Sequence, residues 1–135
     1  MYKKVMVATD GSETAQKALE EAENIANSYN ASLCIVYCVL GDDEKDMAAG
    51  KEILAKAEQS VNALSIETRL VSSNIAYGLN GISEALSDVA KEWQADLVVV
   101  GTANRRGMRR FVVGSVAEQL VSLVESSILL VRPKS

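Results

Sequence analysis

The stretch that decides the fold is residues 96–115, Asp-Leu-Val-Val-Val-Gly-Thr-Ala-Asn-Arg-Arg-Gly-Met-Arg-Arg-Phe-Val-Val-Gly-Ser. Its apolar run 97–100 predicts a strand that is buried on both faces, as in a parallel sheet. The strand ends at Gly101, a basic loop with four arginines follows, and Gly114-Ser115 opens a new helical pattern. A helix N-terminus with unpaired N–H groups beside arginines favours an anion, and a phosphate is the first candidate.

The remainder of the chain alternates between strand and helix patterns. Apolar or alternating runs predict further strands at 3–9, 32–40, 66–71 (near a sheet edge) and 127–131. Helical spacing predicts helices from the turn at 10–13 to Asn30, from Met47 to Leu64, from Ile82 to Trp93, and from Ser115 onward.

Two connections carry specific expectations. Asp10 begins a turn with Glu13 three residues later, a spacing typical of a helix cap. Residues 72–81 contain two glycines and two asparagines and predict a loop longer than most strand-to-helix turns. Tyr77 on this loop is a candidate lid over a bound ligand.

The alternation predicts one α/β domain over residues 1–135, with a parallel sheet covered by helices on both faces. Ligands of such sheets bind beyond the carboxyl ends of the strands, where the winding direction reverses. The two most unusual strand ends are Thr9-Asp10 and Gly101. If these strands are neighbours, both ends face a single crevice.

Composition excludes several classes of function. The chain is 48% hydrophobic, and its net charge of −4 argues against a general nucleic-acid binder. The absence of histidine excludes Ser-His and Cys-His catalysis and a His-ligated zinc site. No segment resembles a signal peptide or is long enough to span a bilayer. Cys34 and Cys38 lie too far apart on one strand to form a disulfide, so we expect buried thiols and a cytoplasmic protein.

The motif Gly101-x-x-Asn104, nine residues, then Gly114-Ser115 resembles the signature of the universal stress protein family. ATP-binding members carry Gly-x-x-Gly, nine residues, then Gly-Ser or Gly-Thr. The resemblance extends to Val-Ala-Thr-Asp-Gly-Ser at 7–12, Val-Ala-Glu at 116–118 and Ile-Leu-Leu-Val-Arg-Pro at 128–133.

This resemblance implies an adenine nucleotide alpha hydrolase-like sheet of order 3-2-1-4-5, with ATP across the ends of strands one and four. It also implies a homodimer through the C-terminal strand, residues 127–132. An exposed apolar edge would otherwise invite indiscriminate association. The positions that match those around the adenine and ribose are Ala8, Thr9, Asp10 and Cys38. Those that match positions around the ribose and phosphates are Val100, Gly101, Asn104, Gly114, Ser115 and Val116.

Several of these residues have a plain structural alternative. Ser115 either donates to a phosphate or is an ordinary helix cap. Asp10 could bind a ribose hydroxyl or Mg²⁺, and it could also serve the capping role given above, since the two are not exclusive. Gly101 either allows close approach of a ligand to the backbone or simply ends a strand.

Asn104 breaks the family pattern. Asparagine adopts positive φ better than other non-glycine residues, so the turn survives, but its side chain either obstructs a phosphate or donates to it. We therefore expect nucleotide binding to be kept but weakened. Of the four arginines, Arg105 and Arg110 are the candidates for phosphate contact, and at least two of the four are expected to be solvated.

These features favour a nucleotide-binding, dimeric stress-response or regulatory protein. The alternative is a dimeric interaction protein of the same family that binds no nucleotide. ATP hydrolysis should be slow at most, because no residue is a convincing base and no lysine completes a P-loop. An adenylating ligase and a phosphorylated receiver domain rank below both, because the residues that those reactions need are missing from the sequence.

Overall fold

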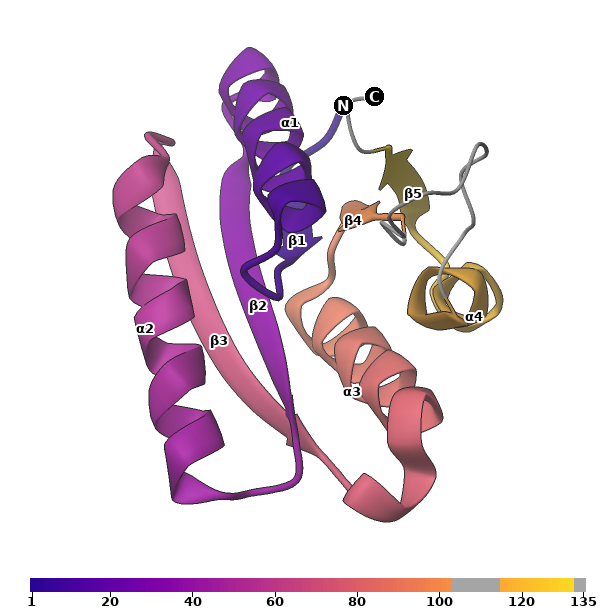
Figure 1. The fold of residues 1–135 in the computed structure, drawn as a ribbon. Helices are drawn as coiled ribbons and strands as arrows, with labels where there is room; N and C mark the ends of the chain where they lie inside the picture. Colours follow the sequence, from indigo (N-terminus) through magenta and orange to yellow (C-terminus); the bar gives the residue numbers. More distant parts are fainter. Residues whose placement is uncertain (103–114, 133–135) are drawn as a thin grey trace.

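The computed structural model describes residues 1–102 and 115–132, apart from the side chains at 75, 79 and 115. Its centre is a parallel sheet in the order β3-β2-β1-β4-β5 (Figure 1). The predicted fold class and strand order are confirmed. The strands are β1 (Lys4–Ala8), β2 (Ser32–Leu40), β3 (Ser65–Ser73), β4 (Leu97–Gly101) and β5 (Ser127–Val131).

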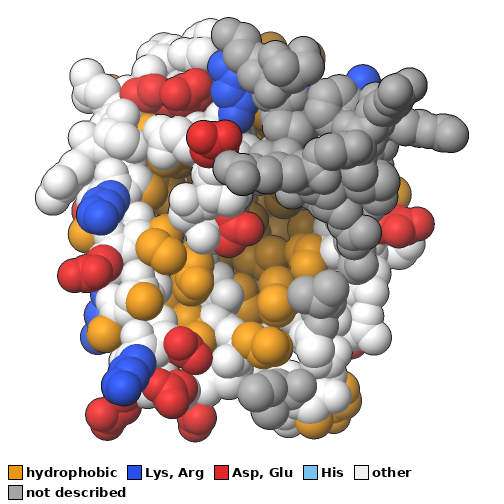
Figure 2. Space-filling model, in the orientation of Figure 1, with side chains coloured by type: hydrophobic (Ala, Val, Ile, Leu, Met, Phe, Trp, Pro, Cys, Tyr) orange, Lys and Arg blue, Asp and Glu red, His pale blue; other side chains and the backbone are white. Residues whose placement is uncertain are grey.

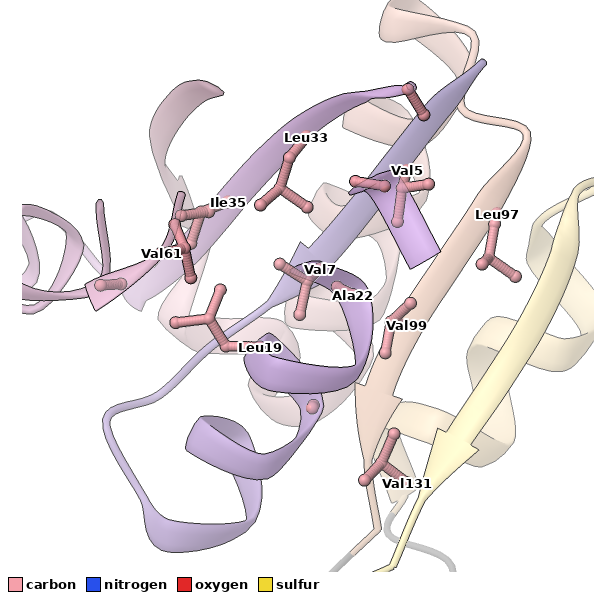
Figure 3. Close-up of a cluster of buried hydrophobic side chains, with 14 of the residues drawn as sticks. Val5, Val7, Leu19, Ala22, Leu33, Ile35, Val61, Leu97, Val99 and Val131 are labelled. Atoms are coloured by element: carbon pink, nitrogen blue, oxygen red, sulfur yellow. The ribbon is translucent and has the colours of Figure 1, made fainter. Parts of the chain in front are cut away.

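Helices cover both faces of the sheet and create two separate cores. They are α1 (Glu13–Tyr29), α2 (Glu44–Ser60), α3 (Gly78–Trp93) and α4 (Ser115–Leu123), with a short 3-10 helix η1 (Ile75–Tyr77). Under α1 and α2, Leu19 and Ala22 pack against strand residues such as Val7 and Val99 (Figure 3). Under α3 and α4, Met6, Val98 and Val100 meet Trp93 and Leu120. Alternate residues of one strand therefore serve opposite cores.

The start of α1 shows which residue caps this helix. The Ser12 Oγ accepts the Ala15 N–H at 3.1 Å, so Ser12 is the N-cap. The interpretation of Asp10 as the cap was therefore wrong, since its Oδ1 accepts the Ser12 N–H at 2.9 Å, in the turn that precedes the helix. The predicted end of the helix at Asn30 is confirmed, with a left-handed φ of 53°.

The second helix ends earlier than its apolar spacing predicted. It stops at Ser60, Val61 is extended, and Leu64 is 80% exposed rather than part of the buried stripe. Side chains of α1 bind the backbone just beyond this end. Glu23 accepts the Asn62 N–H at 2.5 Å and Asn27 donates to the Asn62 carbonyl at 2.9 Å. These contacts hold the chain in an extended turn that leads into β3.

The prediction of a long loop over residues 72–81 was also wrong. β3 continues to Ser73, η1 follows, and α3 already begins at Gly78, which has a φ of 56°. Asn74 supports the tight connection, because its Oδ1 accepts the Ala76 N–H at 2.9 Å. Tyr77 is 63% exposed at the start of α3, and its role as a lid stays a prediction.

Both cysteines are free thiols that pack in the core under α3 and α4, and the prediction that they are buried is confirmed for Cys34 only. Cys34 is buried and Cys38 is partly buried. In the described part of the chain, none of the helices has the length and apolarity that crossing a membrane requires.

Candidate functional site

The strands β1 and β4 lie side by side, as the predicted strand order requires. The two strands pair in parallel with Val7 opposite Val99. The pairing ends there, and Thr9 and Gly101 each follow two residues later along the chain. The end of β4 is fixed on its other side as well, because the Thr102 N–H donates to the Val131 carbonyl of β5 at 2.9 Å.

A hydrogen-bonded turn leads from β1 into α1. The Thr9 N–H still bonds the Val36 carbonyl of β2 at 2.9 Å, and the Thr9 Oγ1 then accepts the Gly11 N–H at 3.3 Å. Gly11 has a φ of 82°, which few other residues tolerate, and lies against Ile53 of α2. This turn leaves Asp10 exposed at the mouth of the crevice.

The strand β2 extends beyond β1 and exposes part of its backbone. Ala8, the last residue of β1, pairs with Val36, whereas β2 continues to Leu40 and pairs there only with β3. Because the Val36 carbonyl points to β1, the N–H and C=O of Cys38 point the same way two residues later. Neither group has a backbone partner among the described residues. The described residues therefore leave one donor and one acceptor of Cys38 without a backbone partner on the side toward β1.

The wall below this free edge is apolar. Ala8, Cys38, Val71 and Ile82 are partly buried and pack against the core under α3 and α4. Figure 2 shows an apolar hollow near the middle of this face, with acidic side chains around it. Burial raises the pKa of the Cys38 thiol, and the nearby Ser73 hydroxyl opposes the shift only in part. Cys38 is therefore neutral at physiological pH, as the rest of this wall is, and a flat uncharged ring suits such a surface.

The structure gives a reason for a glycine at position 101 that the sequence did not suggest. A Cβ at this position would lie 2.6 Å from Thr14 Cγ2 and 3.2 Å from the Thr14 carbonyl oxygen of α1. The glycine thus allows the first turn of α1 to pack directly on the end of β4. This contact is a third explanation, beside ligand approach and strand termination.

The acidic groups near the crevice do not assemble a metal centre by themselves. Within residues 1–102 and 115–132, no three acidic, cysteine or histidine side chains converge on one point. Asp10 and Asp46 lie near the Tyr37 hydroxyl, where burial first and then these two carboxylates raise the tyrosine pKa. A cation at Asp10 would therefore need oxygen ligands from a bound molecule.

The structure brings together part of the predicted set. Ala8, Thr9, Cys38, Val100 and Gly101 meet at the strand ends, and Val116 packs on the same core from the first turn of α4. Asp10 stands at the rim. The start of α4 at Ser115 is as predicted, although its side chain is outside the described residues. The other predicted residues also lie outside them: Asn104, Arg105, Arg110 and Gly114.

Sequence reasoning missed four residues of this region, namely Thr14, Tyr37, Val71 and Thr102. Strand alternation contained a signal for Val71, which shares a face with Cys38 in the paired register. Thr14 and Thr102 had no comparable signal, because their importance depends on how closely α1 approaches β4.

A family model of the universal stress protein family matches residues 1–132. The chain belongs to this family. Among its relatives, a universal stress protein of Methanocaldococcus jannaschii is 27% identical, and the match covers 98% of this chain and 83% of the relative.

Solved structures of universal stress proteins share the fold. One, crystallised in complex with cAMP, is 26% identical with a TM-score of 0.78, and the match covers 98% of this chain and 99% of that one. Another, from Archaeoglobus fulgidus in complex with dAMP, is 22% identical with a TM-score of 0.75, over 96% of this chain and 98% of that one. The latter shows likeness of fold alone.

Proposed function

We propose that this universal stress protein binds an adenine nucleotide across the carboxyl ends of β1 and β4, and that it acts as a dimeric regulatory protein. The observation that carries this proposal is the free edge of β2 at Cys38, directly above an apolar wall and beside the paired ends of β1 and β4. The family relative that was crystallised with cAMP supports an adenine nucleotide as the ligand class.

The free edge suits adenine by its pattern of donor and acceptor. Adenine presents a ring nitrogen that accepts a hydrogen bond beside an exocyclic amine that donates one. The Cys38 N–H and C=O offer the complementary pair, and guanine presents the reverse pattern on the same edge. The apolar wall then covers one face of the ring. We therefore expect adenine to be preferred over guanine.

The phosphates would lie toward Gly101 and the start of α4, where free N–H groups of a helix N-terminus favour an anion. ATP is the first candidate, with Mg²⁺ held between its phosphates and Asp10. Asn104, Arg105, Arg110, Gly114 and Ser115 stay predicted contacts of these phosphates. A single domain over residues 1–135 is part of the same proposal.

Isothermal titration of the full chain with ATP, AMP and cAMP, each with and without Mg²⁺, tests this proposal. GTP is the matched control for the base. Binding of adenine nucleotides at micromolar to millimolar concentration, with GTP at least about tenfold weaker, is the expected result. If none of the nucleotides binds at millimolar concentration, the alternative of a family member that binds no nucleotide takes its place.

The variant Gly114→Val distinguishes loss of the phosphate site from loss of the fold. We expect Gly114→Val to abolish nucleotide binding because a branched side chain fills the space in front of the α4 N-terminus. The melting temperature and the oligomeric state should be unchanged. A variant that loses the dimer together with the nucleotide would mean that this glycine is structural.

The two edges of the sheet support a dimer through β5. The outer strand β3 carries Glu67 and Arg69, which form an ion pair at 2.6 Å, and such charges discourage further strand pairing. The opposite edge strand β5 has no charged residue, and Ile128, Leu129 and Leu130 on it are half-buried. An uncharged apolar edge favours pairing with a second copy.

Two substitutions at Leu130 in β5 test the dimer. Because the Val131 carbonyl bonds β4, the N–H of Leu130 points outward, away from the sheet. Leu130→Pro should yield monomers in sedimentation analysis, since it removes an outward donor. Leu130→Ala loses the same side chain but keeps the N–H, so it should remain dimeric. A monomeric wild type would refute pairing through this strand.

A further inference from the structure

Buried hydroxyl groups without a hydrogen-bond partner gather at the end of β4. Within the described part of the chain, three buried side-chain oxygens lack a partner: Thr14 Oγ1, Thr102 Oγ1 and Ser126 Oγ. Two of them flank Gly101, one being next in the chain and the other in contact across the helix–sheet interface. A buried hydroxyl without a partner loses its hydrogen bonds to water and gains none in the protein, so such a pair of residues requires an explanation.

The two hydroxyls lie on opposite sides of the sheet. Gly101 faces Thr14 of α1. Val100 belongs to the core under α3 and α4, and the chain is still bonded to β5 at Thr102, so the Thr102 side chain lies on the α4 side. Val116 and Ala117, in the first turn of α4, pack on that same core. Thr102 is only 6% exposed, so its Oγ1 is buried at the end of β4, on the face of the sheet that α4 covers.

We propose that the Thr102 hydroxyl is a phosphate-binding group of the nucleotide site. It donates to a phosphate oxygen that the α4 N-terminus holds from the other side. The inference rests on the proposed function, because it assigns a residue to that site. Two independent features meet here: a nine-residue helix whose N-terminus favours an anion, and a buried donor that has nothing to bond. Thr14, on the opposite face of the sheet, belongs to the first turn of α1, whose N-terminus is already capped by the Ser12 hydroxyl.

Titration calorimetry with adenosine, AMP and ATP tests this assignment on the full chain. Thr102→Val keeps the shape of the side chain and removes the hydroxyl. We expect it to weaken AMP and ATP by about tenfold or more, the effect of one hydrogen bond to a charged group, and adenosine by less than about twofold. Thr102→Ser keeps the hydroxyl and should bind all three like the wild type. Thr14→Val is the matched control, and it should leave all three affinities unchanged.

The outcomes separate this inference from the function on which it rests. If the wild type binds AMP and Thr102→Val binds it equally well, the assignment is wrong and the nucleotide site stands. Equal losses for adenosine and AMP would mean that the residue acts through the fold, which also overturns the assignment. If the wild type binds none of the three ligands, the proposed function itself fails. Thr102→Ala is a second hydroxyl-free variant, should the valine not fold.

Discussion

Gly101→Ala is the sharpest test of how the end of β4 is built. The added Cβ would lie 2.6 Å from Thr14 Cγ2, about 1 Å inside the normal contact distance of two carbon atoms. The Thr14 carbonyl oxygen at 3.2 Å belongs to the backbone of α1 and cannot rotate away. Overpacking of this kind costs about 1–3 kcal/mol. We therefore expect a loss of about 2 kcal/mol in the free energy of unfolding, or about 6–8 °C in melting temperature for a chain of this size.

A double-mutant cycle followed by urea unfolding identifies the contact responsible. Thr14→Ser removes the clashing Cγ2 and keeps the hydroxyl, so it should restore about half of the stability lost in Gly101→Ala. The coupling between the two substitutions should reach about 1 kcal/mol. If Gly101→Ala unfolds at the wild-type urea concentration, or if Thr14→Ser restores nothing, the packing argument is refuted. A stable Gly101→Ala that loses nucleotide affinity would instead assign the glycine to ligand approach.

Three further predictions concern stability. Asp96→Ala removes a carboxylate whose Oδ2 accepts the Lys3 and Lys4 N–H groups, both at 2.8 Å, and should lower the unfolding free energy by about 1–2 kcal/mol; an unchanged urea midpoint would contradict this. Ser12→Ala removes the α1 cap and should cost about 1 kcal/mol, with Ser12→Asp as the control that retains an acceptor. Burial, then Glu67, raises the pKa of Cys34 from 9.0 to about 12, so the thiol favours the folded state below about pH 9, and this stability is lost as pH rises from about 9 to 12. Between pH 7 and pH 11, the melting temperature of Cys34→Ala should fall less steeply with pH than that of the wild type. An equal fall in both proteins would exclude the effect.

The sequence was sufficient for the strands because burial on both faces leaves a strong pattern. Alternation and crossover rules predicted a parallel sheet that contains the run 97–100 and the strand ending at Thr9, whereas the adjacency of these two strands came from the family resemblance. The end of α2 could not be predicted, because Leu64 keeps the helical spacing although Glu23 and Asn27 hold the following turn. That competition depends on side chains far away in the sequence.

In the candidate site too, local patterns were predictable and contacts between distant residues were not. Thr9, Cys38 and Gly101 were accessible from strand ends and the family motif. The capping role given to Asp10 failed because Ser12, two residues later, has the better geometry for the helix. The orphaned hydroxyls of Thr14 and Thr102 could not be anticipated, since a threonine becomes an unsatisfied group only when the surrounding packing excludes water.

The overhang of β2 past β1 has a consequence for mutagenesis. A ligand that is held by main-chain groups offers no side chain whose removal would release it. Alanine scanning across Cys38 would thus report a silent position even if the base docks there. Backbone-altering chemistry, such as an ester in place of the Cys38 peptide N–H, is what would expose the contact. Because such a contact needs no particular side chain, a substitution at this residue can leave the recognition pattern unchanged.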